Sequence, residues 1–164
     1  MVIWIIGMSG SGKSFYGKNI ESILSKKHKT IHIDGDEVRE YITDELKYTK
    51  KDRKKNSLII RKLCKFLEAK GYLVICSILS IFPDHQKNNR KYFNKYIQIY
   101  IKADIKTLKT KNNKKIYLKK NVVGKDIKFP NPYKPDLIIK NDYKNNKKRI
   151  FQIIKFINDR QKNN

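Results

Sequence analysis

The feature that most constrains the fold is the segment GMSGSGKS at residues 7–14, which directly follows the apolar run 2–6. It matches the pattern G-x-x-x-x-G-K-[ST], in which a glycine-rich turn joins a buried strand to a helix. The glycines let backbone N–H groups converge on phosphate oxygens, and the positive end of the following helix faces the same anion. The segment therefore predicts a strand, a phosphate-binding loop and a helix that together hold a nucleoside triphosphate.

Within this loop, the pattern assigns separate tasks to individual residues. Lys13 should reach the β- and γ-phosphates of ATP, and the Ser14 hydroxyl should ligate Mg²⁺. The predicted ATP-binding residues are Gly7, Ser9, Gly10, Ser11, Gly12, Lys13 and Ser14. The alternative is a glycine turn that binds no nucleotide, which is disfavoured because the required strand and helix patterns flank the loop.

The rest of the chain alternates between strand-like and helix-like segments. Short apolar runs predict strands at 2–6, 30–33, 72–79, 96–101 and 136–139. Apolar spacing and end signals predict helices at about 13–27, 36–46, 51–70, 83–93, 104–111 and 145–161. This alternation indicates an α/β protein of the P-loop NTPase fold, with about five parallel strands and helices on both faces, in a single domain over residues 1–164.

Residues 112–135 interrupt the alternation with a stretch rich in Lys, Asn, Gly and Pro. Because a strand and a helix follow, we expect a lysine-rich lid here rather than a linker between domains. Cationic residues of a lid can close over phosphates and neutralise the charge of a transition state.

The chain is strongly basic, with a formal net charge of +24 at pH 7. One explanation is an anionic partner such as nucleic acid. The favoured explanation is a composition rich in Lys, Asn and Ile, because the lysines are scattered rather than aligned. The few arginines are more informative, since arginine is the usual residue for specific phosphate contacts, and they are Arg39, Arg53, Arg61, Arg90, Arg149 and Arg160. A basic nucleic-acid-binding ATPase is kept as the non-enzyme alternative.

The cysteines and apolar runs indicate where the protein resides. Cys64 and Cys76 lie in apolar stretches without the spacing of a metal site or a disulfide framework, so we expect buried free thiols in a reducing cytoplasm. No segment approaches the roughly 18 apolar residues of a membrane helix. The apolar run 2–6 is also too short for a signal peptide. We therefore expect a cytoplasmic protein without a membrane partner.

A second polar segment, IHIDGDEVR at residues 31–39, places two carboxylates at the end of a predicted strand. In an open parallel sheet that end faces the ligand crevice. Asp34 and Asp36 are therefore candidates for organising Mg²⁺ and for accepting a proton from a substrate hydroxyl. The alternative is that one of them only caps the helix beginning near residue 36, and this alternative is strong for Asp36 taken alone.

The segments GMSGSGKS, IDGDEVR and YTKKDRKKN occur in this order and resemble the adenylylsulfate (APS) kinase family. Its members carry GxSGxGKS, DGDNxR and FSxxDRxxN at the same spacing, and the resemblance extends from residue 1 to about residue 139. Those enzymes transfer the γ-phosphate of ATP to the 3′-hydroxyl of a nucleotide whose 5′-phosphate carries a sulfate. The resemblance thus implies that ATP and a second nucleotide are the partners.

The resemblance also implies roles for individual residues. It makes Lys13, Asp34 and Asp36 catalytic, with Mg²⁺ held by Ser14 and Asp34. Tyr48 takes the place of the phenylalanine that stacks on the acceptor base, and Arg90 matches a later arginine of the family. The implied acceptor-binding residues are Asp36, Arg39, Tyr48, Arg53, Asn56, Ser80, Lys119 and Lys120. Because relatives are often dimers, the resemblance also allows a homodimer.

The chain departs from the family pattern on the acceptor side. Glu37 replaces the asparagine of DGDN, and Ile81 and Pro83 stand where the family has proline and arginine. Val122 replaces a lid phenylalanine that forms the second wall around the base, so Tyr48 is left as the stacking residue. These changes favour a different nucleotide acceptor.

One relative with such an acceptor is the cytidine diphosphoramidate kinase of bacterial capsule assembly, which we take as the leading hypothesis. Adenylylsulfate itself is the close alternative. A third alternative is another small P-loop kinase that acts on a nucleoside monophosphate or a metabolite hydroxyl, although residues 112–135 lack the arginines usual in the lids of such enzymes.

Overall fold

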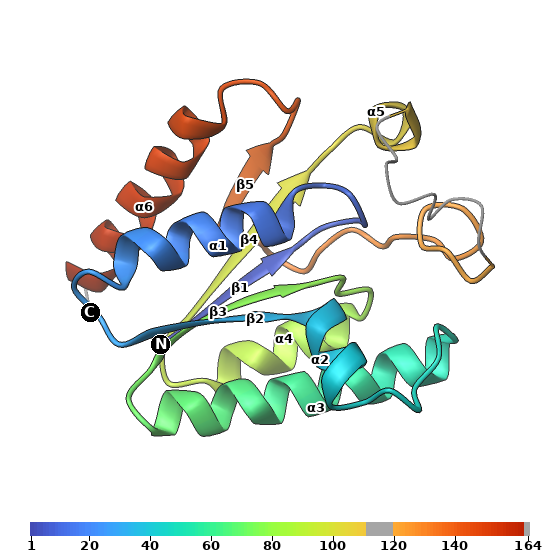
Figure 1. The fold of residues 1–164 in the computed structure, drawn as a ribbon, viewed down its shortest axis with the longest axis horizontal. Helices are drawn as coiled ribbons and strands as arrows, with labels where there is room; N and C mark the ends of the chain where they lie inside the picture. The colour runs from blue at the N-terminus through green and yellow to red at the C-terminus, as the bar shows by residue number, and fades with distance from the viewer. Residues whose placement is uncertain (111–119, 163–164) are drawn as a thin grey trace.

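One parallel sheet organises the computed structural model, which describes residues 1–110 and 120–162 (Figure 1). Its five strands lie in the order β2-β3-β1-β4-β5. They are β1 (Val2–Ile6), β2 (Thr30–Asp34), β3 (Leu73–Ile78), β4 (Tyr96–Lys102) and β5 (Leu137–Lys140). The predicted parallel α/β sheet of about five strands is thereby confirmed.

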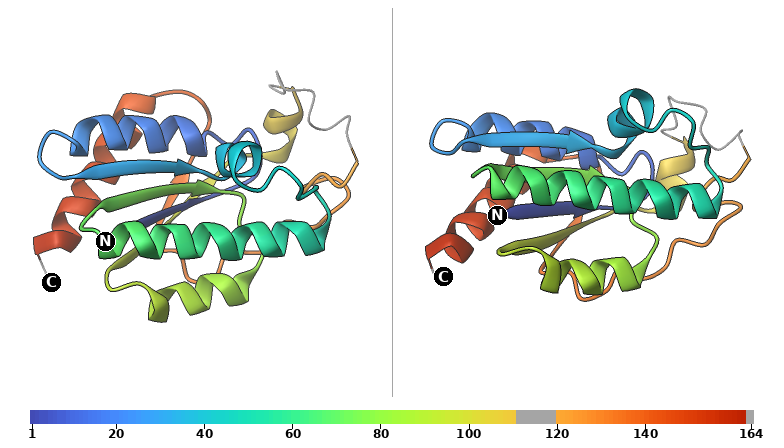
Figure 2. Two further views of the ribbon diagram at one scale, coloured as in Figure 1. Left: turned by 60° about the horizontal axis from the view of Figure 1, so that its bottom comes forward. Right: turned by 90° about the horizontal axis from the view of Figure 1, so that it is seen from below.

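Helices cover both faces of this sheet, as the sequence predicts. The described helices are α1 (Lys13–Leu24), α2 (Gly35–Tyr41), α3 (Lys50–Ala69), α4 (Pro83–Tyr92), α5 (Ile105–Thr110) and α6 (Asn146–Lys162). Helices α1 and α6 lie on one face, whereas α3 and α4 lie on the other (Figures 1 and 2). Among the described residues, no helix combines the length and the apolar character needed to cross a membrane.

The central strand β1 is buried on both faces, which explains its continuous apolar sequence. Ile3 and Ile5 belong to the core layer beneath α1 and α6. Val2, Trp4 and Ile6 belong to the layer beneath α3 and α4. All five side chains are at most 1 % exposed. The strand therefore fixes the position of the loop that follows it, residues 7–12.

Two helices end earlier than predicted. The helix expected over 36–46 ends at Tyr41, where the Thr43 N–H returns to the Val38 carbonyl and the Thr43 hydroxyl donates to Asn56 Oδ1 at 2.8 Å. The helix expected over 13–27 ends at Leu24, whose carbonyl accepts the N–H groups of the next turn.

Helix α3, predicted over about 51–70, begins with a reciprocal cap at Thr49. The Thr49 hydroxyl accepts the Asp52 N–H at 3.1 Å and donates to the Asp52 carboxylate at 2.7 Å. Such a cap satisfies N–H groups that have no partner inside the helix. The cap places Arg53 and Asn56 in the first two turns of α3, beside the carboxyl edge of the sheet (Figure 1).

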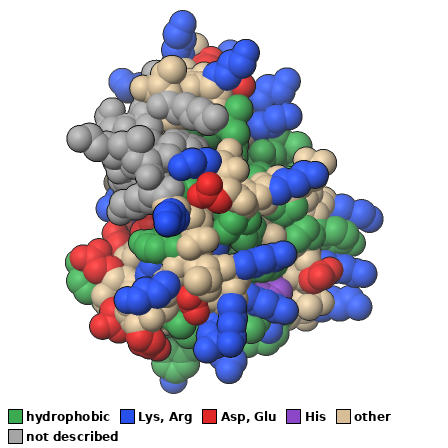
Figure 3. All heavy atoms as spheres, turned by 90° about the vertical axis from the view of Figure 1, so that its right-hand side faces the viewer, with side chains coloured by type: hydrophobic (Ala, Val, Ile, Leu, Met, Phe, Trp, Pro, Cys, Tyr) green, Lys and Arg blue, Asp and Glu red, His purple; other side chains and the backbone are tan. Residues whose placement is uncertain are grey.

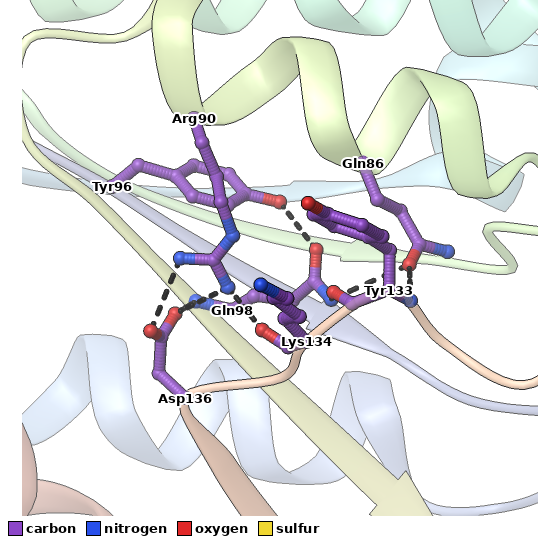
Figure 4. A network of polar contacts seen from close by, with 7 residues as sticks. All are labelled: Gln86, Arg90, Tyr96, Gln98, Tyr133, Lys134 and Asp136. Atoms are coloured by element: carbon purple, nitrogen blue, oxygen red, sulfur yellow. Dashed lines mark hydrogen bonds and ion pairs between the residues drawn. The ribbon is translucent and has the colours of Figure 1, made fainter.

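A buried polar network holds the chain where it returns to the sheet before β5 (Figure 4). Gln86 Oε1 accepts the Tyr133 N–H at 2.6 Å, and Gln98 Nε2 donates to the Tyr133 carbonyl at 2.8 Å. Arg90 binds both carboxylate oxygens of Asp136, at 3.1 and 3.0 Å. The two glutamines are fully buried. Arg90, which matches a family arginine, thus anchors this segment.

Candidate active site

The loop between β1 and α1 has a backbone that requires its glycines. Gly10 and Gly12 have φ angles of 80° and 97°, in the left-handed region that glycine adopts readily. A Cβ atom on Gly7 would lie 2.6 Å from the Ile101 carbonyl oxygen. The glycine spacing is therefore a requirement of this loop's shape.

The predicted donor-side residues gather around this loop. The Lys13 ammonium group donates to the Met8 carbonyl at 2.9 Å, so the side chain lies along the loop. A narrow hollow of about 40 Å³ opens beside it, and the predicted residues that line it are Ser9, Lys13, Ser14, Asp34, Asp36, Arg39, Arg53 and Asn56. The structure thus brings residues from three separate motifs to one place.

A polar loop after β5 supports the phosphate-binding loop, and sequence reasoning missed it. Asn141 Nδ2 donates to the Ser11 carbonyl, and the Tyr143 hydroxyl donates to the Gly10 carbonyl, both at 2.8 Å. The Tyr16 hydroxyl in turn donates to Asn141 Oδ1 at 3.2 Å. The available signal was a polar Asn-Asp-Tyr run directly after the last strand, at the edge where ligands bind.

The two carboxylates of the second motif have different surroundings. Asp34 is the N-cap of α2, because its Oδ1 atom accepts the Asp36 N–H at 2.8 Å. The capping alternative therefore applies to Asp34 and not to Asp36. The Asp36 residue is exposed and lines both the narrow hollow and the larger cavity beside it. Its carboxylate can therefore contact ligands on either side.

The larger cavity has a volume of about 630 Å³, within the usual range for a small-molecule site. It shares Ser9, Asp36, Arg39, Arg53 and Leu79 with the narrow hollow, so the two form one continuous site. Its other lining residues are Glu40, Asp44, Leu46, Lys47, Tyr48, Lys120, Asn121, Val122 and Val123.

Two arginines make the junction of the cavities strongly positive. The guanidinium groups of Arg39 and Arg53 lie 4.9 and 5.3 Å from the centre of the Tyr48 ring. Burial, and then the charge of Arg39, lower the pKa of Arg53. Neither arginine forms an ion pair with a described residue. Arg39 is buried and Arg53 half-buried, and two such cations without an ion-paired carboxylate among the described residues favour a bound anion.

These arginines also organise the walls of the cavity. Arg39 donates to the carbonyl groups of Leu46 and Lys47, at 3.2 and 2.8 Å. Arg53 donates to the Asn121 carbonyl at 3.1 Å, which joins α3 to a segment 68 residues further along the chain. The carboxyl-terminal part of the expected lid therefore lies over the cavity.

The remaining predicted acceptor residues divide into two groups. Asn56 lines the hollow, with its Oδ1 atom held by Thr43. Ser80 is buried and lines neither cavity; its hydroxyl oxygen accepts a hydrogen bond from Gln86 at 3.2 Å. Lys120 lines the larger cavity. Lys119, like residues 112–118 of the expected lid, lies outside the described residues.

Of the substitutions that separate this chain from the family pattern, Val122 is the one that reaches the cavity. Glu37 instead forms a surface ion pair with Lys18 at 3.5 Å. Ile81 is buried, and Pro83 is the first residue of α4. Among the described lining residues, Tyr48 is therefore the aromatic wall, and an aliphatic residue stands at the position of the second.

Two further observations describe the surroundings of the site. Another cavity, of about 580 Å³, lies beside β5 and contains no residue of the three motifs.

Figure 3 shows the face at the carboxyl edge of the sheet, where Lys and Arg side chains lie in several separate groups rather than in one stripe. The basic charge is thus spread widely over this face.

Comparison with known proteins identifies the family of this site. The family model described as adenylylsulphate kinase matches residues 1–140. The chain belongs to the adenylylsulfate kinase family. It is 36 % identical over 160 residues to the cytidine diphosphoramidate kinase of Campylobacter jejuni, covering 93 % of each protein. It is 25 % identical over 170 residues to the adenylyl-sulfate kinase of Staphylococcus carnosus, covering 98 % of this chain and 85 % of that protein.

Solved structures support the same fold for this adenylylsulfate kinase family member. The structure of the Mycobacterium tuberculosis APS kinase in complex with AMPPNP and APS matches it with a TM-score of 0.88 at 22 % identity, and 96 % of each chain is covered. The predicted resemblance and the P-loop fold are confirmed. The chain is an ATP-dependent kinase that transfers phosphate to a hydroxyl group.

Proposed function

We propose that this kinase transfers the γ-phosphate of ATP to the ribose 3′-hydroxyl of cytidine diphosphoramidate. The observation that carries the proposal is the acceptor cavity, in which Tyr48 and Val122 form the walls and Arg39 and Arg53 provide the charge. Stacking on the Tyr48 ring would contribute about 1–3 kcal/mol for the base, and Val122 removes the second stacking wall that the family pattern provides for adenine. The two arginines suit the linked phosphates of a nucleotide anhydride. The similarity to the Campylobacter jejuni enzyme supports the same assignment.

On the donor side, the loop amides and Lys13 would bind the triphosphate. The donor set also fits Mg²⁺, which prefers one or two oxygen side chains together with phosphate oxygens and water. Ser14 and Asp34 supply a hydroxyl and a carboxylate beside the loop and would hold the ion. When bound, Mg²⁺ neutralises phosphate charge.

Between donor and acceptor, Asp36 would act on the attacking hydroxyl. Its carboxylate is exposed where the narrow hollow meets the larger cavity. A carboxylate within reach of the 3′-hydroxyl accepts its proton as the oxygen attacks the γ-phosphorus. Phosphoryl transfer depends mainly on positioning and charge neutralisation, which Lys13, Arg53 and Lys120 would add around the reacting groups.

Adenylylsulfate is the second candidate acceptor, and a specific observation favours it. The family residues Arg39, Arg53 and Asn56 all line the hollow and would bind a phosphosulfate as well as a phosphoramidate. The two candidate acceptors therefore differ in the base that contacts the cavity wall and in the terminal group of the anhydride. With either acceptor, ATP and a second nucleotide are the partners.

Two buried free thiols suit a cytoplasmic location, which forms part of the proposal.

The position of phosphorylation tests the proposed reaction. After incubation with ATP, Mg²⁺ and cytidine diphosphoramidate, the product should show a new phosphomonoester whose ³¹P signal couples to the ribose H3′. A 3′-deoxy analogue of the acceptor should release no ADP above the level without acceptor. Phosphate on another atom, or turnover of the 3′-deoxy analogue, would reject the assignment.

A further inference from the structure

A serine–histidine pair lies at the acceptor site, and neither residue was predicted to have a role. Ser57 follows Asn56 on α3, lines the same narrow hollow, and is 5 % exposed. Its hydroxyl oxygen is 3.1 Å from Nδ1 of His85 on α4. The His85 ring packs against Phe82, with ring centres 5.1 Å apart, and is itself buried. The hydrogen bond and the ring contact therefore orient the Ser57 hydroxyl at the edge of the hollow.

The surroundings of His85 favour the neutral form of its ring. Burial, followed by the charges of Arg61 and Lys54, lowers the pKa of His85, while Asp84 acts in the opposite direction. A neutral imidazole carries one N–H group and one acceptor nitrogen. We take the tautomer with its proton on Nε2, in which Nδ1 accepts the hydrogen bond from Ser57; the opposite tautomer would make Ser57 a donor toward a ligand.

This assignment determines what Ser57 can offer to a ligand. A serine hydroxyl has one proton and two lone pairs. Because the proton is directed to His85, the Ser57 oxygen faces a ligand as an acceptor only. It can bind an N–H group, whereas a sulfate or phosphate oxygen brought to the same point would place two acceptors together. A buried polar group left without its partner costs binding energy.

We propose that Ser57, oriented by His85, selects acceptors whose terminal anhydride group carries an N–H donor. The terminal amine of a phosphoramidate meets this requirement, and the oxygens of sulfate or ionised phosphate do not. Arg39, Arg53 and Asn56 line the same hollow and would bind the anionic oxygens common to all of these groups. The inference rests on the proposed function, because it assumes a nucleotide anhydride in this site. Ser57 would then be a specificity-determining residue and His85 its positioning residue.

A matched pair of acceptors tests the inference at pH 8. Cytidine diphosphoramidate and cytidine diphosphate share base, ribose and length, and differ in a terminal NH₂ group or oxygen. The wild-type enzyme should favour the phosphoramidate in kcat/KM. Ser57→Ala should reduce that preference by about tenfold, the size expected for one hydrogen bond, and leave the KM for ATP unchanged.

Variants of His85 test whether this residue orients the Ser57 hydroxyl or only links α3 to α4. His85→Asn keeps an acceptor near the position of Nδ1 and should retain part of the preference. His85→Phe leaves the serine proton free to turn toward the ligand and should lose the preference. A structural role alone would lower the melting temperature of the variants without changing the ratio between the two acceptors.

The outcomes distinguish failure of the inference from failure of the proposed function. Turnover of cytidine diphosphoramidate with the same acceptor ratio in wild type and Ser57→Ala would overturn the inference alone. Absence of turnover by the wild type would overturn the proposed function and the inference with it. Should Ser57→Ala not fold, calorimetric binding of the two acceptors to the wild type decides, and equal affinities would overturn the inference.

Discussion

Three single residues serve different parts of the proposed reaction between two nucleotides. Lys13 lies along the phosphate-binding loop, Arg53 lies in the acceptor cavity, and Asp36 lines the space that both share. Because the three side chains come from different segments, each can be changed without removing the others. Their variants should therefore show different kinetic signatures.

Lys13→Ala should abolish ATP turnover, with ADP release reduced by about 10² or more. The ammonium group supplies charge to the phosphates, and the loss of one such preorganised group typically costs about 10²–10³ in rate. Lys18→Ala is a matched control, because Lys18 is an exposed lysine of the same helix and forms a surface ion pair with Glu37. ADP release by Lys13→Ala at the level of this control would contradict the assignment of the loop.

Asp36→Asn should lower kcat by about 10²–10⁴, the usual contribution of general base catalysis, and should change the KM for ATP little. Steady-state ADP release at varied ATP and saturating acceptor measures both values. Glu37→Gln provides the control, since its carboxylate is adjacent in sequence but lines neither cavity. A loss that fell mainly on ATP binding would make the proposed role of Asp36 wrong.

Arg53→Ala should reduce kcat/KM for the acceptor by about 10–100-fold, because a charge-assisted contact worth about 1.5–3 kcal/mol is lost. Arg53→Lys should recover part of the loss, since lysine keeps the charge without the bidentate geometry. Arg61→Ala on the same helix serves as the control, because Arg61 packs on Tyr92 away from the cavity. Unchanged acceptor kinetics in Arg53→Ala would refute its placement in the acceptor site.

At the scale of the elements, the network around Gln98 joins β4, α4 and the segment that leads into β5. Besides Tyr133, the Gln98 side chain contacts the Tyr96 hydroxyl at 2.9 Å, and its backbone N–H donates to Asp136 at 2.8 Å. Arg90 also donates to the Lys134 carbonyl. Most of these groups bond to one another, although the buried Arg90 Nε atom has no hydrogen-bond partner among the described residues. Networks of this kind specify a single arrangement of the chain.

Asp136→Asn should destabilise the protein by about 1–3 kcal/mol, because Arg90 would lose its charged partner inside this network. Urea unfolding at neutral pH measures the change. Glu37→Gln, which removes only an exposed ion pair, should unfold almost as the wild type does. A free energy of unfolding equal to that of the wild type would show that the ion pair does not anchor the segment.

The elements themselves were largely predictable, because their signals are local. The apolar run at 2–6 and the glycine spacing after it predict β1, the loop and α1 without further information. The end of α2 was not predictable, since the contact between Thr43 and Asn56 involves another helix. The end of α1 was also misplaced, although the hydrogen bonds to the Leu24 carbonyl that follow it are local. The start of α3 was predicted within about one residue, and the Thr49–Asp52 spacing carries the recognisable signal of its cap.

The candidate site was predictable only where a motif marks it. Arg39, Arg53 and Asn56 lie together as the motif spacing implies. Asn141 and the Ser57–His85 pair were missed, because the contacts that give them a role join residues far apart in sequence. Ser80 illustrates the opposite case, since the motif match places it at the acceptor while its hydroxyl is bonded to Gln86 inside the protein.

At the scale of the whole molecule, the net charge of +24 and the acceptor site call for separate explanations. Lys and Arg side chains are distributed over the visible face in Figure 3, as a lysine-rich composition predicts. The specific charge is carried by two arginines inside the cavity. A nucleic-acid-binding role is therefore not needed to account for the basic residues, and a homodimer stays a prediction.

The central claim is that an adenylylsulfate kinase scaffold is used here for a phosphoramidate acceptor. The most direct measurement compares kcat/KM for cytidine diphosphoramidate and for adenylylsulfate at saturating MgATP, with ADP release as the common readout. A single aromatic wall and a terminal N–H requirement predict a preference of at least about tenfold for cytidine diphosphoramidate. A clear preference for adenylylsulfate would contradict the account.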